Sequence, residues 1–74
     1  MTAEEYIAAR ATLGWPHRKI AQVLGSSLRT SFRWQAGETE ISEPTARLLR
    51  VLLVLRLTSA KRFDEVVNQL EQQP

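Results

Sequence analysis

Basic side chains are concentrated in a long stretch of the chain that has no acidic residue. Residues 6–37 contain neither Asp nor Glu. An acid-free segment of this kind suits a polyanionic partner such as nucleic acid, and the alternative is an ordinary solvated surface on which charges cluster by chance. Five basic residues lie in this stretch: Arg10, Arg18, Lys19, Arg29 and Arg33.

Residue types that support catalysis or metal binding are scarce. The chain has one histidine, His17, one aspartate, Asp64, and no cysteine. These residues make no nucleophilic set, and the sequence has no glycine-rich phosphate loop and no metal-ligand spacing. We therefore expect no enzyme, no metal site and no cofactor.

The elements that must position the basic residues are predicted to be five helices, so the expected fold class is all-α. Period-two alternation of β-branched residues is absent, whereas apolar residues recur at helical spacing and Gly, Pro and Ser separate the segments. The expected helices span about residues 2–13, 16–25, 28–37, 42–57 and 59–72.

The stretch IAQVLGSSLRTSFRWQAG, residues 20–37, predicts two short helices joined by a tight turn. Gly25 supplies the positive φ that such a turn requires, and Ser27 is an expected N-cap for the second helix. Ala21 allows the two helices to cross closely, while Leu24 and Trp34 close the core from either side. The second helix is thereby expected to present its N-terminal residues outward.

This stretch resembles the Cro/phage-repressor type of helix-turn-helix proteins, also called the xenobiotic-response-element family. The resemblance extends over about two-thirds of the chain and leaves out the fifth helix. It implies a repressor-like helix-turn-helix domain from about residue 16 to 37 that binds double-stranded DNA. The matching residues in register are Ala21, Leu24, Gly25, Ser27, Thr30, Trp34 and Gly37.

The resemblance also implies which residues meet the DNA. Leu28, Arg29, Phe32 and Arg33 hold the positions that face base edges, where arginine suits guanine and an apolar side chain suits a thymine methyl. The arginines alternatively only neutralise phosphates, and Phe32 alternatively fills the core or a dimer interface. At the start of the second helix, His17 and Arg18 suit phosphate binding; the alternative is that both are solvated. The predicted DNA-binding set is His17, Arg18, Ser27, Leu28, Arg29, Thr30, Phe32 and Arg33.

The chain departs from the family pattern at several positions. His17 stands where Gln is usual, Ser31 replaces Ile or Val, and Phe32 occupies a position that is usually polar. Ser26 likewise replaces a usual Val. Gln35 replaces a Glu that often pairs with an arginine at the position of Arg10, so the expected contact is at best an Arg10–Gln35 hydrogen bond.

The fourth and fifth helices carry more apolar surface than one small core uses, so we expect a homodimer. Residues 1–57 are predicted to form the DNA-binding domain, and 58–74 a helix for dimerisation or partner binding. The alternative function is an antitoxin or protein-interaction module that uses this last helix on a protein partner. The predicted dimer interface comprises Leu48, Val51, Leu55, Phe63, Val66, Val67 and Leu70.

The expected location is the cytoplasm. The first ten residues contain acids and lack the basic and apolar regions of a signal peptide, and the longest apolar run is residues 51–55. The resemblance implies a sequence-specific transcriptional regulator, a dimeric repressor that occludes a promoter. Small members of the family are typical of phages and mobile elements, where they repress their own operon.

Overall fold

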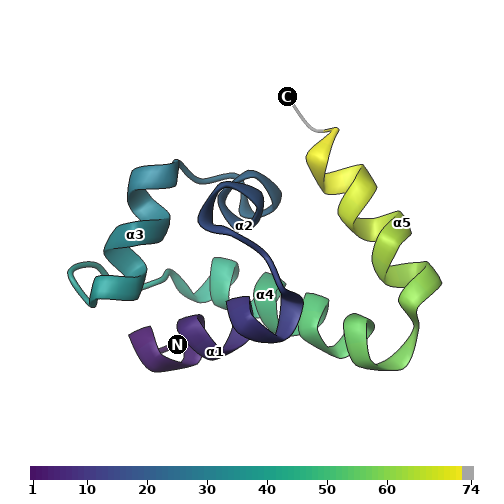
Figure 1. The fold of residues 1–74 in the computed structure, drawn as a ribbon, viewed down its shortest axis with the longest axis horizontal. Helices are drawn as coiled ribbons and strands as arrows, with labels where there is room; N and C mark the ends of the chain where they lie inside the picture. Colours follow the sequence, from purple (N-terminus) through teal and green to yellow (C-terminus); the bar gives the residue numbers. More distant parts are fainter. Residues whose placement is uncertain (73–74) are drawn as a thin grey trace.

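The computed structural model describes residues 1–72 and confirms the all-α prediction with five helices. They are α1 (Ala3–Leu13), α2 (His17–Leu24), α3 (Leu28–Ala36), α4 (Glu43–Thr58) and α5 (Ala60–Glu71). Residues 1–72 contain no strand. Figure 1 shows α1 and α4 along one side of the molecule, with α2 and α3 on the other side and α5 turning back from the end of α4.

Local sequence signals explain where the helices begin and end. Thr2 and Glu5 form a reciprocal capping box at the start of α1. The Ser27 side chain accepts a hydrogen bond from the backbone N–H of Thr30 and so caps α3. Gly25 ends α2 with φ of 74°, which lets its N–H reach back to the last turn. Pro16 is the N-cap of α2 and not its first helical residue, because its backbone is still extended with ψ of 166°.

One hydrophobic core joins all five helices. Tyr6 of α1 and Trp34 of α3 meet edge to face with ring centroids 5.5 Å apart. Trp15, in the loop after α1, stacks on Phe63 of α5 with centroids 5.7 Å apart. Trp34 is therefore buried in the core as expected, and Trp15 is half-buried against it. The buried core residues are Tyr6, Ala9, Leu13, Ile20, Val23, Trp34, Ile41, Ala46, Leu49, Leu52, Phe63 and Val67.

Helix α5 packs on α2 and α4 of the same chain. Phe63 and Val67 are only 7% and 6% exposed, and Lys19 of α2 forms an ion pair with Glu71 at the end of α5. The side chains of Phe63 and Val67 are thus buried against their own chain, and their place in a dimer interface stays a prediction. Val66 and Leu70 are half-buried against the same core.

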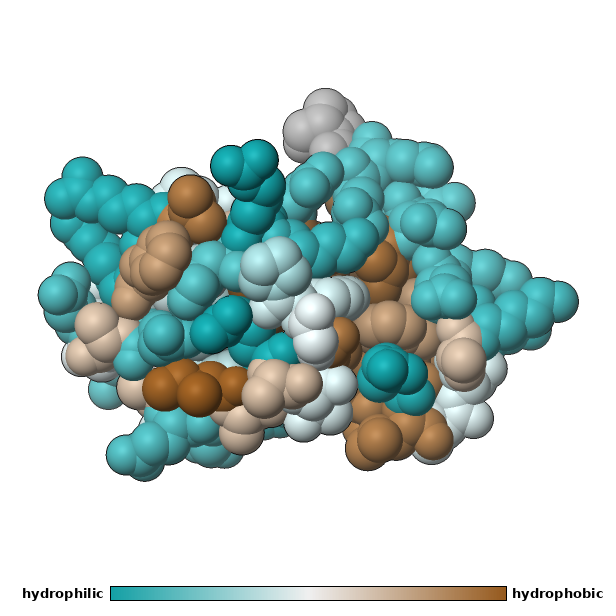
Figure 2. Space-filling view, viewed as in Figure 1, coloured by the Kyte–Doolittle hydropathy of each residue, from teal (hydrophilic) through white to brown (hydrophobic). Residues whose placement is uncertain are grey.

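The outward face of α4 remains apolar. Val51, Val54 and Leu57 are 53%, 59% and 76% exposed, while Leu48 and Leu55 are half-buried beside them. Figure 2 shows hydrophobic residues gathered where α4 ends and α5 begins. Of the expected interface residues, Val51 is therefore exposed, and Val54 and Leu57 extend the same apolar surface. None of the helices within residues 1–72 has the length and hydropathy that crossing a membrane requires.

Candidate nucleic-acid interface

The turn between α2 and α3 consists of three residues and holds the two helices against each other. The N–H of Ser26 donates to the carbonyl of Ala21 at 2.9 Å, which closes the end of α2. Buried Ser31 and Trp34 anchor the inner face of α3, and α3 packs on both α1 and α2. Because one face of α3 is held by these contacts, its other face is presented to solvent in a defined orientation.

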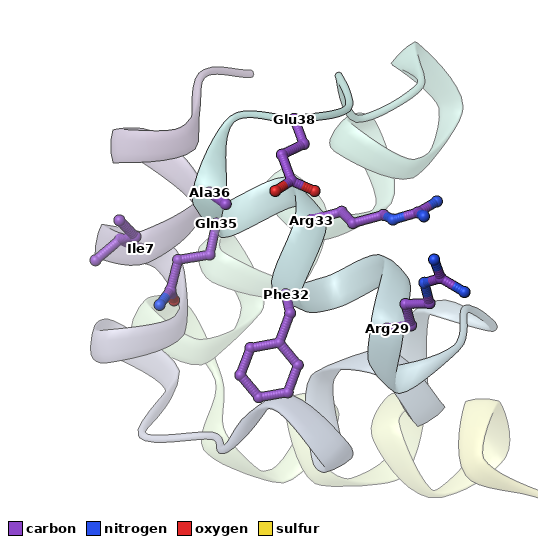
Figure 3. Close-up of a pocket in the computed structure, with 7 residues that line it drawn as sticks. All are labelled: Ile7, Arg29, Phe32, Arg33, Gln35, Ala36 and Glu38. Atoms are coloured by element: carbon purple, nitrogen blue, oxygen red, sulfur yellow. The ribbon is translucent and has the colours of Figure 1, made fainter.

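That outer face carries two arginines and two large apolar residues. Leu28 is 44% exposed and Phe32 is 52% exposed; Arg29 and Arg33 are also exposed and lie one helical turn apart. In Figure 3 both arginine side chains extend away from α3 on the same side of the helix. Within residues 1–72 neither arginine forms an ion pair, so both positive charges are free to meet a polyanion.

An open hollow runs along this side of α3 and reaches α1. Besides Arg29, Phe32 and Arg33, it is lined by Ile7 of α1 and by Gln35, Ala36 and Glu38. Figure 3 shows Ile7 and Gln35 on one side of Phe32 and the two arginines on the other. Ile7 is 42% exposed and has no role in the sequence-based prediction. The sequence feature that could have indicated it is a large apolar residue on the outer side of a helix whose other outer residues are small or polar.

His17 and Arg18 lie in the first turn of α2, as expected. Arg18 is exposed, whereas His17 is half-buried and its ring stacks on that of Phe32, with centroids 4.0 Å apart and planes at 28°. Burial, and secondarily the positive charge of Arg10, lowers the pKa of His17 below its ordinary value. His17 is therefore neutral near pH 7. The stacking also shows that Phe32 lies on the surface beside His17 and does not fill the core.

A buried hydrogen-bond network lies directly behind His17. Nδ1 of His17 is 2.7 Å from Oγ of Ser31, and the same Oγ is 2.5 Å from the hydroxyl of Tyr6. Tyr6 and Ser31 are fully buried. Sequence reasoning noted Ser31 only as a replacement for Ile or Val and gave Tyr6 no role. The available signal was that His17, Ser31 and Phe32 all depart from the family pattern together.

Arg10 makes the contact expected from the sequence. Its Nη2 donates to Oε1 of Gln35 at 2.9 Å, and its Nη1 donates to the carbonyl of Trp15 at 3.3 Å. Its Nε is buried without a hydrogen-bond partner in the described chain. Arg10 therefore ties α1 to the end of α3 and does not point toward the outer face.

The remaining predicted residues support the start of α3. Oγ of Ser27 and Oγ1 of Thr30 lie 2.9 Å apart, so both hydroxyls are engaged at the helix cap. On α4, Arg47 and Arg50 both approach Glu43, at 3.1 and 3.5 Å, and their charges are partly neutralised there. Of the predicted DNA-binding residues, the structure thus brings His17 against the outer face of α3. Arg18 follows His17 on α2 and is exposed.

The outer face of α3 offers guanidinium donors and apolar side chains. Within residues 1–72 no three His, Cys, Asp or Glu side chains gather where they could hold a metal ion. Comparison of the chain with protein-family models, with curated proteins and with solved structures found no match.

Proposed function

We propose that this protein is a sequence-specific DNA-binding transcriptional regulator in which α3 enters the major groove of double-stranded DNA. The observation that carries the proposal is the outer face of α3, where Arg29 and Arg33 form no ion pair within residues 1–72 and lie together on one side of the exposed ring of Phe32. Arginine can donate two hydrogen bonds to guanine, and the apolar side chains can contact thymine methyl groups.

The arrangement of α2 and α3 supports the same proposal. A helix that reads bases must be held from behind, and its neighbour must approach the phosphate backbone. Ser31 and Trp34 hold α3 from behind, while His17 and Arg18 lie at the N-terminus of α2, where backbone N–H groups favour an anion. The sequence between residues 6 and 37 adds no acid that would repel phosphate.

The proposed regulator acts as a homodimeric repressor in the cytoplasm and occludes a promoter. Val51, Val54 and Leu57 support dimerisation, because a small protein rarely leaves three large apolar side chains of one helix in water. Two copies of α3 would then meet half-sites about 34 Å apart, one helical turn of DNA. No separate effector region is needed for a repressor of this kind.

The alternative, a protein-interaction module that uses α5, has less support. Its apolar stripe would have to be available to a partner, yet Phe63 and Val67 are buried in the chain's own core. The remaining apolar surface of α5 is limited to a shallow area at Val66 and Leu70.

Selection of bound duplexes from a random pool tests the proposal. We expect enrichment of a two-fold symmetric site with half-sites one helical turn apart. Recovery of duplexes without any shared sequence would contradict base reading, and failure to retain any duplex at low salt would contradict DNA binding itself.

A further inference from the structure

Three helices contribute to one hydrogen-bonded chain that ends at the proposed DNA surface. Tyr6 of α1 contacts Ser31 of α3, and Ser31 contacts Nδ1 of His17 at the start of α2. Nε2 of His17 makes no hydrogen bond within residues 1–72 and is not among the enclosed polar atoms that lack a partner, so it faces solvent. The hydrogen-bonded network therefore extends from the core to a single exposed ring nitrogen of His17.

The number of available hydrogens determines which group donates in each hydrogen bond of the Tyr6–Ser31–His17 network. Burial raises the pKa of the Tyr6 hydroxyl, although its bond to Ser31 and the charge of Arg10 oppose the shift, so Tyr6 keeps its hydrogen. If Tyr6 donates to Ser31 and Ser31 donates to Nδ1 of His17, both hydroxyl hydrogens are used. In neutral imidazole the remaining hydrogen is then on Nε2.

The opposite direction leaves a buried hydrogen without an acceptor. If Nδ1 carried the hydrogen, Nδ1, Ser31 and Tyr6 would have three hydrogens for two hydrogen bonds. Either the Tyr6 hydrogen or, if Ser31 accepted from both neighbours, the Ser31 hydrogen would then have no side-chain acceptor within residues 1–72. An unsatisfied donor at a fully buried position is strongly disfavoured. The first direction is therefore the stable one.

We propose that Tyr6 and Ser31 are positioning residues that hold His17 in the tautomer with its hydrogen on Nε2 and aim that N–H at a phosphate of the DNA backbone. Phe32 also holds His17 in place, because the phenyl ring covers one face of the imidazole at 4.0 Å between centroids and so restricts rotation of the imidazole. This inference rests on the proposed function for the identity of the anion, while the tautomer is independent of it.

The tautomer can be measured without DNA, because His17 is the only histidine in the chain. Protein labelled with ¹⁵N-histidine is examined by NMR at about pH 8, where an ordinary histidine is neutral. We expect Nε2 to show the shift of a protonated nitrogen and Nδ1 that of an unprotonated one. A hydrogen found mainly on Nδ1, or an even mixture of tautomers, would overturn the proposal.

Variants separate positioning from general stability. Ser31→Ala removes the donor to Nδ1 and is expected to move the ring toward a mixture of tautomers, while Tyr6→Phe retains the Ser31 hydroxyl and is expected to give a smaller change. Ser26→Ala is the matched control, because Oγ of Ser26 is also buried but has no hydrogen-bond partner within residues 1–72. This variant should leave the His17 signals unchanged. Unchanged signals in folded Ser31→Ala and in folded Tyr6→Phe would also overturn the proposal.

DNA affinity tests the second half of the inference. We expect Ser31→Ala to weaken binding to the selected duplex by about threefold to tenfold, the loss typical of one hydrogen bond. In a His17→Ala background the same substitution should cause no further loss. An equal loss in both backgrounds would overturn positioning through His17. If the wild-type protein binds no duplex, the proposed function and the phosphate contact fall together, whereas the NMR result still decides the tautomer.

Discussion

Replacing Gln35 by Glu should stabilise the protein through Arg10. In the present structure a neutral amide oxygen accepts the 2.9 Å hydrogen bond from Nη2 of Arg10, and Nε of Arg10 is buried without a hydrogen-bond partner among residues 1–72. The Gln35→Glu substitution keeps the size of the side chain, adds a negative charge beside a half-buried guanidinium and offers a second acceptor oxygen. An arginine–carboxylate pair with two acceptors is the stronger arrangement.

Two opposing effects set the magnitude. The existing bond already has a charged donor, so the gain comes from the second acceptor oxygen, which adds one hydrogen bond to a charged group at about 1.5–3 kcal/mol before the cost of desolvating the new carboxylate. Gln35 is the penultimate residue of α3, and a negative charge near a helix C-terminus costs about 0.3–1 kcal/mol. The expected net increase in the free energy of unfolding is about 1 kcal/mol, which corresponds to a rise in Tm of about 4–8 °C for a domain of this size.

Thermal unfolding of Gln35→Glu, alone and in an Arg10→Met background, provides the assay. The stabilisation should vanish when Arg10 is replaced, and it should be present at neutral pH. Because the pair lowers the pKa of the new carboxyl in the folded state, the added stability should disappear as the pH falls below about 4. A lower Tm at neutral pH, or the same gain without Arg10, would refute the reasoning.

Three further predictions concern the histidine, the turn and the apolar face of α4. Because the pKa of His17 is lowered in the folded state, stability should be fully present above about pH 6.5 and should decrease as the pH falls below it; thermal unfolding of His17→Gln should lack this slope between about pH 5.5 and 7. Gly25→Ala should cost about 1 kcal/mol in denaturant unfolding, because φ is 74° while nothing lies within 4 Å of the added Cβ; a cost well above this would reveal a steric clash. Val54→Asp should convert a dimer into a monomer in sedimentation without lowering Tm under dissociating dilution, since Val54 is 59% exposed; an unchanged dimer would place the interface elsewhere.

The helices and their limits follow closely from the sequence because local chemistry sets them. Thr2 with Glu5, Ser27 and the three glycines determine caps that depend only on neighbouring residues. The contact between Arg10 and Gln35 was also predictable, since it follows from comparing one position with a family pattern.

Contacts between distant elements were harder to predict. As a sequence pattern, the apolar stripe of α5 is equally compatible with burial in its own core and with a dimer interface. Only the packing of α5 onto α2 and α4 shows that Phe63 and Val67 are buried within the chain. In the Tyr6–Ser31–His17 network, Tyr6 and Ser31 are 25 positions apart and His17 and Ser31 are 14 apart. Local periodicity in the sequence does not predict contacts over such separations.

The most direct test of the central claim compares single arginine variants on the selected duplex and on a scrambled duplex at several salt concentrations. If α3 reads bases, Arg29→Ala or Arg33→Ala should cost about 1–3 kcal/mol on the selected duplex and relax the preference at one base pair. Arg18→Ala should weaken binding to both duplexes alike and make the slope of log affinity against log salt shallower by about one. Equal losses on both duplexes for Arg29→Ala and for Arg33→Ala would contradict base reading, and the assignment as a sequence-specific regulator would fail with it.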